Sequence, residues 1–354
     1  MDLKTLSADI KLSIVEDRDL SSLNLEGLDF SGITLKNINF KGNKLERVLF
    51  ENASLENCDF DATILSQVSF KKCKLISCRF RNAKIYWSDF RYAEVSQITL
   101  EGAKIDYCDF YRTFFMGVGI FRKTRISNSS LYYTYFDEGS TLRKENIVDN
   151  KILQQDKDNY EKFLTDWNLY GTGVRTNNQQ CVSDWSPMSS LRSRYADAED
   201  IYKNLNGLWT SKGFLSDSNW AYVQGKRMER YRMFSELLYE KNNFYIKIKK
   251  VLSIIMNFFL DMFFGYGESM RKMIFTYIVV VCVFAYIFYA SNDVSVHTYL
   301  RAIGISFKNM VAITSDEVSS VSPFIDFLNV VQTTIGILLT GIFGFILGNK
   351  IRNQ

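Results

Sequence analysis

The sequence predicts a multidomain chain: a square β-solenoid, then an α-helical hairpin, then an all-α domain with two membrane-spanning helices. Three observations support this order. Apolar residues recur every five positions through the first third, helical spacing follows in the middle, and two long uncharged segments come last. Residues 273–354 hold only 8 of the 82 charged side chains. The two parts of the chain therefore suit different surroundings, water and lipid.

A five-residue period defines residues 20–140. Reading every fifth residue from Leu25 to Phe115 gives nineteen apolar side chains in succession. The phase then slips by one residue near Gly117 and Gly119 and resumes. A period of five fits neither the 3.6-residue repeat of a helix nor the two-residue repeat of a strand. It requires a chain that turns a corner every five residues, so that residues twenty apart stack on one face.

This period resembles that of the pentapeptide-repeat family, whose pattern is A(D/N)LXX. The stretches Ala53-Ser-Leu-Glu-Asn and Cys58-Asp-Phe-Asp-Ala match the pattern. The resemblance implies a right-handed quadrilateral β-helix with four repeats per coil. We expect residues 1–19 to form an N-terminal cap segment in front of it.

Stacking at intervals of twenty residues predicts the composition of the solenoid interior. Two walls should be phenylalanine and two aliphatic. One phenylalanine column would hold Phe30, Phe50, Phe70, Phe90 and Phe110, and the opposite one Phe40, Phe60 and Phe80. The small inward position is expected to bury four cysteines as small hydrophobic side chains, and these are Cys58, Cys73, Cys78 and Cys108.

The charge balance argues against one role known for this family. Some pentapeptide-repeat proteins mimic DNA with a strongly acidic rod and inhibit topoisomerases, whereas residues 21–136 carry slightly more basic than acidic side chains. The formal net charge of the chain is only +4, which also argues against a strongly basic nucleic-acid binder. We therefore expect no nucleic-acid partner. The solenoid should serve as a spacer or dock an unidentified cytoplasmic protein or ligand.

The middle of the chain should be largely helical. Residues 141–188 are polar and irregular and predict a junction, and residues 189–243 show the spacing of an antiparallel helical hairpin. Residues 244–272 predict an interfacial amphipathic helix and linker, because lysines there precede an apolar stretch and would meet anionic lipid headgroups. The membrane-interface candidates are Lys247, Lys249, Lys250, Arg271 and Lys272.

Two uncharged segments predict a two-transmembrane domain at residues 273–354. Residues 273–292 and 327–349 are each long enough to cross a hydrocarbon layer of about 30 Å. Residues 299–313 lie between them, are too short and too charged to span, and predict a re-entrant helix. Basic residues flank the ends away from this linker, so the positive-inside rule places both termini in the cytoplasm. The predicted location is the bacterial inner membrane, as a multi-pass protein in contact with the lipid bilayer.

The order of span, short helix, polar loop and span resembles the prokaryotic potassium-channel-like pore superfamily. More closely, the chain resembles bacterial proteins that fuse pentapeptide repeats to such a pore and carry a GYGE-like stretch before the first span, as residues 265–268 do. The potassium filter motif is absent, because the corresponding segment 312–317 contains no glycine. The resemblance implies a homo-oligomer, with a tetramer favoured. It would conduct monovalent cations with weak selectivity.

The candidate pore residues form two groups. The mouth or filter candidates are Ile313, Thr314, Ser315, Asp316 and Glu317. Four copies of the two acids would attract cations, and the acids suit a solvated outer loop equally well. The lining candidates are polar or small side chains along one stripe of the second span, and these are Asn329, Thr333, Gly336, Thr340 and Gly344. Such a stripe faces either a water-filled pore or another helix.

Two classes of function stay open. The first is a tetrameric ion channel gated or assembled through a cytoplasmic pentapeptide-repeat domain, with a depolarising stress or phage-defence effector as a variant. The second is a membrane-anchored scaffold whose β-helix docks a partner while the two spans only anchor and oligomerise. An enzyme is the least supported class, since His297 is the only histidine and the sequence offers no phosphate loop or nucleophile–base pair. We expect no catalytic residue, metal site or cofactor.

Overall fold

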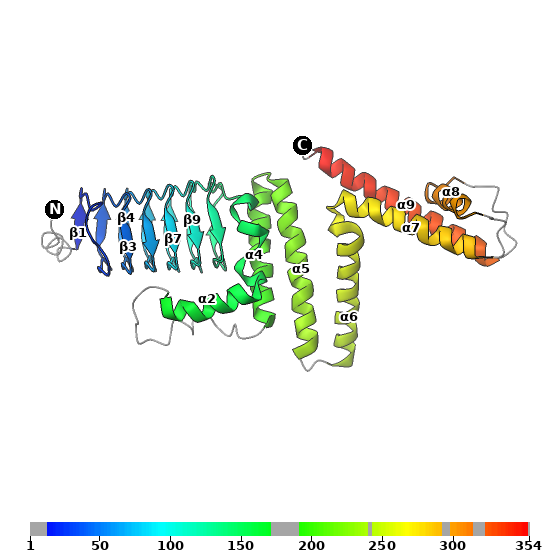
Figure 1. Cartoon of the computed structure of the whole chain (residues 1–354), viewed down its shortest axis with the longest axis horizontal. Helices are drawn as coiled ribbons and strands as arrows, with labels where there is room; N and C mark the ends of the chain where they lie inside the picture. The colour runs from blue at the N-terminus through cyan, green and yellow to red at the C-terminus, as the bar shows by residue number, and fades with distance from the viewer. Residues whose placement is uncertain (1–12, 171–190, 240–242, 292–297, 314–322, 353–354) are drawn as a thin grey trace. The chain divides into compact units, whose positions relative to one another are not determined.

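The computed structural model describes residues 13–170, 191–239, 243–291, 298–313 and 323–352. The chain forms two compact units, residues 1–240 and residues 241–354 (Figure 1). The first unit holds the predicted solenoid and helical hairpin. The second holds the predicted interfacial helix and both predicted spans.

The first unit begins with a parallel β-solenoid of about six turns. A seven-stranded sheet and a five-stranded sheet form two of its sides, and single β-bridges such as Asp19 to Asn39 join the other two. Strands on one side pair twenty residues apart, which confirms a chain that turns four corners in each coil. The strands are β1 Ile14–Glu16, β2 Thr34–Lys36, β3 Lys44–Glu46, β4 Ser54–Glu56, β5 Ile64–Ser66, β6 Lys74–Ile76, β7 Lys84–Tyr86, β8 Glu94–Ser96, β9 Lys104–Asp106, β10 Phe114–Met116, β11 Arg125–Ser127 and β12 Tyr135–Phe136.

A left-handed backbone residue makes nearly every corner of a coil. It lies two positions after an inward side chain, as Asn37 does after Leu35 (φ 53°) and Gly42 after Phe40 (φ 72°). Asparagine and glycine tolerate this region best. Trp87 also adopts it (φ 50°), and its ring stacks on a neighbouring coil. Burial of the closed, apolar interior therefore outweighs the local backbone strain at these corners.

The interior contains the two predicted phenylalanine columns. Ring centroids lie 5.3 Å apart for Phe30 and Phe50, 5.1 Å apart for Phe50 and Phe70, and 4.6 Å apart for Phe60 and Phe80, each pair stacked. Rings of opposite columns meet edge to face, as Phe50 and Phe60 do at 6.2 Å. The predicted inward cysteines are buried, free thiols. Desolvation by burial raises the pKa of the thiols at Cys73 and Cys78 well above the ordinary value.

The solenoid extends further than predicted at both ends. Strand β1 falls inside the expected cap segment 1–19, because the five-residue period already includes the fully buried Val15 and Leu20. At the other end, bridges from Gly119 to Ser140 and from Ile126 to Ile147 continue the stack. Pairing shifts from twenty to twenty-one residues there, as in β9 with β11, which confirms the phase slip.

The expected irregular junction contains a helix. Three short 3₁₀ turns, η1 Lys144–Asn146, η2 Val148–Asn150 and η3 Leu153–Gln155, precede helix α2 Lys157–Tyr170. Tyr160 and Phe163 are buried with Leu153, packed against Tyr107 of the solenoid. The Lys162 ammonium also lies 5.1 Å from the Tyr107 ring centroid. This apolar docking explains why a polar segment is helical, and Figure 1 shows α2 beside the solenoid.

Helices α4 Leu191–Ser211 and α5 Leu215–Tyr239 form the predicted antiparallel hairpin. It packs on the last solenoid coils, where the Trp209 indole donates to the Leu142 carbonyl (2.8 Å). Apolar side chains at helical spacing form a seam along both helices. The seam is buried on α4, but Phe234 and Leu238 on α5 are 51% and 62% exposed. Their spacing is helical, yet they lie on the exposed face of α5, since the adjacent Ser235 and Glu236 are buried.

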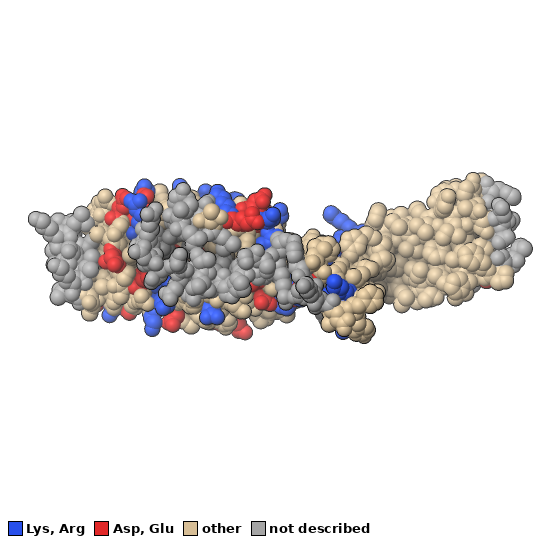
Figure 2. Space-filling model, turned by 90° about the horizontal axis from the view of Figure 1, so that it is seen from below, with Lys and Arg blue, Asp and Glu red and all other residues tan. Residues whose placement is uncertain are grey.

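The second unit consists of helices. They are α6 Phe244–Phe259, the π-helical turn η4 Leu260–Phe264, the 3₁₀ turn η5 Gly265–Gly267, α7 Met270–Ala290, α8 Tyr299–Met310 and α9 Pro323–Arg352. Helices α7 and α9 are long and apolar enough to cross a membrane. Only 28% and 22% of their apolar segments is buried inside the chain, whereas a core helix of a water-soluble protein would be mostly buried. Figure 2 shows charged atoms scattered over the solenoid and an almost uniformly uncharged surface over α7, α8 and α9.

Candidate functional site

The region of greatest functional interest is the contact of α8 with α7 and α9. At the start of α8, the Tyr299 hydroxyl donates to the Cys282 carbonyl of α7 (3.2 Å). Further along, the Ser306 hydroxyl donates to the Val281 carbonyl (2.8 Å). The Phe307 ring then lies edge-on to Tyr277, 6.4 Å between centroids. Helix α8 therefore runs from the C-terminal part of α7 towards its middle.

A buried polar network fixes α8 to α9. The Gln332 amide nitrogen donates to the backbone carbonyl (3.0 Å) and hydroxyl of Ser306, and Gln332 is fully buried. The Asn309 amide donates to the Gln332 side-chain oxygen (3.2 Å) and to that of Asn329 (2.9 Å). Buried polar groups are costly unless they find such partners. Ser306, Asn309 and Gln332 were not among the predicted site residues, although Asn329 and Gln332 share a face at i, i+3.

Gly336 is the point of closest approach between α9 and the end of α8. A Cβ atom added there would lie 2.2 Å from the Met310 carbonyl oxygen, so only glycine fits. Among the other lining candidates, Asn329 also contacts α8, Thr333 is half-buried, and Thr340 and Gly344 are exposed. The structure thus divides the predicted stripe between a helix-packing face and an exposed edge.

Helix α8 ends in a capped turn. Ala312 is left-handed (φ 57°), its backbone N–H donates to the Asn309 carbonyl (3.1 Å), and the Ile313 N–H donates to the Lys308 carbonyl (2.9 Å). This is the hydrogen-bond pattern of a Schellman cap. Ile313, the first mouth candidate, is 57% exposed. The other mouth candidates, Thr314, Ser315, Asp316 and Glu317, lie outside the described residues.

The corner between α6 and α7 is held by specific contacts. The Lys272 ammonium donates to the Asp261 carboxylate (2.9 Å) and carbonyl (2.5 Å), and the Thr276 hydroxyl donates to the Phe263 carbonyl (2.8 Å). Gly265 is left-handed, and a Cβ there would lie 2.7 Å from that of Ser269. Lys272 therefore has a structural partner. Of the other interface candidates, Lys247, Lys249 and Arg271 are exposed and Lys250 is half-buried.

A second polar cluster lies where α4 meets the solenoid. Asp197 is 4% exposed, and its carboxyl interacts with the Tyr132 side chain of the solenoid. Desolvation by burial raises the pKa of its carboxyl to about 7. The same burial raises the pKa of Tyr132 well above its ordinary value. Ionisation of Asp197 therefore opposes the docking of the hairpin on the solenoid.

Comparison with known protein families finds a match, and it lies within the solenoid. Residues 43–119 match the profile described as "Pentapeptide repeat region". No curated protein matches the chain.

Three solved structures illustrate the similarity. Rfr23, a pentapeptide-repeat protein of the cyanobacterium Cyanothece 51142, is 14% identical over 38% of this chain and 100% of its own (TM-score 0.25). QnrB1, a plasmid-mediated fluoroquinolone resistance protein, is 14% identical over 43% and 85% (0.20). A pentapeptide-repeat protein of the Arabidopsis thaliana thylakoid lumen is 24% identical over 32% and 68% (0.12). Because these scores are low, the assignment rests on the matched profile and on the strand register. The N-terminal solenoid of this chain is a pentapeptide-repeat domain.

Proposed function

We propose that the second unit forms an oligomeric membrane pore, with a tetramer favoured, that conducts monovalent cations with weak selectivity. The observation that carries this proposal is the depth at which α8 ends. Its last residues contact Tyr277, 13 residues before the end of α7, and Gly336, 13 residues after the start of α9. At 1.5 Å per residue, both positions are about 20 Å from the helix ends, well inside a hydrocarbon layer of about 30 Å.

Non-helical backbone at that depth needs special surroundings. Inside a bilayer it is tolerated only where protein buries it or where it lines a water-filled cavity. Residues 311–313 follow the helix and are exposed in the single chain. Further copies of the chain around a central aqueous path would supply both conditions. A re-entrant helix between two spans is the arrangement that pore domains use.

The acids that follow α8 support a preference for cations. Asp316 and Glu317 come three and four residues after Ile313. In a tetramer they would gather up to eight carboxylates near one axis, which favours cations over anions. The absence of glycine in this segment gives no support for a carbonyl-lined potassium filter, so we propose weak discrimination among cations.

The remaining parts of the chain would control or assemble this pore. We place both termini in the cytoplasm of a bacterium and the spans in its inner membrane, following the distribution of basic residues. The pentapeptide-repeat domain would then dock a cytoplasmic protein or ligand. Its effect would reach the spans through the α6–α7 corner. We propose no catalytic role.

Conductance of the full-length protein in planar bilayers tests the proposal. We expect cation-preferring currents from the wild type and a lower cation-to-anion permeability ratio for Asp316→Asn/Glu317→Gln. Asp326→Asn is the matched control, because Asp326 is an exposed acid in the first turn of α9. Absence of current from the wild type and the double variant alike would refute the pore. A monomer or dimer in native mass spectrometry would favour the membrane-anchored scaffold instead.

A second measurement does not depend on the pore being open. In a background with Cys181 and Cys282 replaced by serine, Ile313→Cys should react with a membrane-impermeant thiol reagent in liposomes. Leu338→Cys should not, although Leu338 is exposed to a similar degree (61% against 57%). Equal reactivity of the two cysteines would contradict a water-filled cavity at the end of α8.

A further inference from the structure

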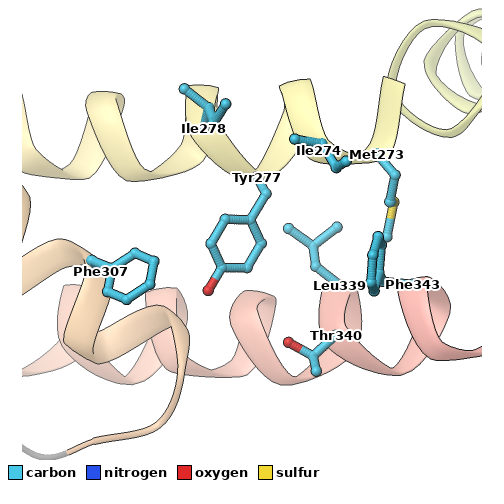
Figure 3. Close-up of a pocket in the computed structure, with 8 residues that line it drawn as sticks. All are labelled: Met273, Ile274, Tyr277, Ile278, Phe307, Leu339, Thr340 and Phe343. Carbon is cyan, nitrogen blue, oxygen red and sulfur yellow. The ribbon is translucent and has the colours of Figure 1, made fainter. Parts of the chain in front are cut away.

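A groove with a volume of about 300 Å³ lies between α7 and α9, beyond the end of α8. Figure 3 shows its walls, with side chains of α7 on one side and of α9 on the other. Phe307 of α8 closes one end. The principal lining residues are Ile274, Tyr277, Ile278, Leu339 and Phe343.

The groove follows from the length of α8. Helix α8 fills the angle between α7 and α9 only along the half that contains Val281 and Gln332. In the other half, where Ile274 and Phe343 lie, no third helix of the described chain lines the groove. The groove walls are apolar apart from the hydroxyls of Tyr277 and Thr340, both drawn in Figure 3. Such a surface suits a flexible apolar ligand with little hydrogen-bonding demand.

A basic side chain, Arg271, lies within one helical turn of the first lining residues of the groove. Arg271 shares one face of α7 with the lining residues Ile274 and Ile278, at i, i+3 and i+7. Arg271 is exposed, whereas its neighbour Lys272 is engaged with Asp261. A guanidinium at the end of a span lies at the level of lipid headgroups and matches a phosphate with two parallel hydrogen bonds.

We propose that this groove binds one acyl chain of an anionic glycerophospholipid from the surrounding bilayer, with the lipid phosphate on Arg271. Charge complementarity at the rim and the apolar walls together select this occupant over a polar peptide. The inference rests on α7 and α9 lying in a bilayer, as the proposed pore also does. It does not require that the pore conduct ions.

Native mass spectrometry of the full-length protein, offered phosphatidylglycerol or phosphatidylcholine in detergent, tests the site. Ile278→Trp should fill the groove and lower lipid occupancy about tenfold, because several methylenes lose their burial. Val283→Trp is the matched control, being exposed on the same helix but outside the groove. Arg271→Gln should keep the lipid and lose about fivefold of the preference for phosphatidylglycerol. Lys249→Gln, an exposed cation on α6, should not.

A photoactivatable phosphatidylglycerol with a mid-chain diazirine checks the same site in the unmodified protein and should label the groove residues. Equal lipid occupancy in the wild type and Ile278→Trp, or labelling elsewhere only, would overturn the proposal. If Ile278→Trp lost its oligomers but kept its lipid, the groove would instead bind a second copy of the chain, and the proposal would be overturned as well. If lipid binds but no ion current is seen, only the proposed pore is refuted. If current is seen but no lipid binds, only the proposed lipid site is refuted.

Discussion

Replacing Gly336 by alanine tests the contact between α8 and α9 most directly. The added Cβ would lie 2.2 Å from the Met310 carbonyl oxygen and 2.7 Å from the Met310 carbonyl and α carbons. Real Cβ contacts are not shorter than about 3 Å, so the backbone at the end of α8 must move by about 1 Å. Overpacking of this kind costs about 1–3 kcal/mol.

Gly341→Ala is the matched control, because a Cβ at Gly341 meets nothing within 4 Å. Both variants gain about 1 kcal/mol of helix propensity, so this term cancels when they are compared. Thermal unfolding of the full-length protein in detergent should therefore show Gly336→Ala less stable than Gly341→Ala by about 1–3 kcal/mol. Equal stabilities would show that α8 does not pack on Gly336.

Three further predictions concern buried polar groups. Gln332→Leu should lower stability by about 1–3 kcal/mol, because the polar groups on α8 lose their partner, measured by thermal unfolding in detergent. Lys272→Met should cost about 1–2 kcal/mol in the same assay, because the buried Asp261 carboxylate loses its counter-ion. The first unit should become less stable as the pH rises from 4 to 7, monitored during urea unfolding by tryptophan fluorescence, since all five tryptophans of the chain lie in that unit. The reason is that the pKa of Asp197 is about 7 when folded and 3.8 when unfolded, so the folded state binds the extra proton over that interval.

Each of these predictions has a control and a contrary outcome. Thr334→Val on the exposed side of α9 should leave stability unchanged, and a loss equal to that of Gln332→Leu would point to general disruption of the helix. Arg271→Met should be milder than Lys272→Met, and the reverse order would refute the corner ion pair. Asp197→Asn should remove the pH dependence, whereas Asp158→Asn on the exposed face of α2 should retain it. A wild-type stability that rises between pH 4 and 7 would contradict a protonated Asp197.

The solenoid interior could be predicted well, because the five-residue period of the sequence directly determines which side chains stack on one another. Each inward side chain contacts the one twenty residues away, so a repeat in the sequence becomes a column such as Phe30, Phe50 and Phe70. The ends were less predictable, since only Val15 and Leu20 continue the phase ahead of Leu25. Helix α2 was missed because two aromatic residues, Tyr160 and Phe163, supply the burial that holds it in place.

The candidate site was predicted in outline only. A glycine or asparagine in an apolar helix suits a pore wall and a helix contact equally, and the position of α8 decides between them. That position depends on contacts distant in sequence, such as Ser306 with Gln332 and Met310 with Gly336. For the same reason Lys272 resembled a lipid-facing lysine, because its partner Asp261 lies across the α6–α7 corner.

The constant register of the solenoid has a geometric consequence. From β1 to β10 each coil pairs with the next at an interval of twenty residues, so a whole coil can be inserted or deleted there without disturbing its neighbours. Each such change would lengthen or shorten the rod by one strand spacing, about 4.8 Å. The single extra residue near Gly117 is absorbed at a corner instead. The number of coils in the repeat domain therefore sets the distance between its first strand and the helical hairpin that packs on its last coils.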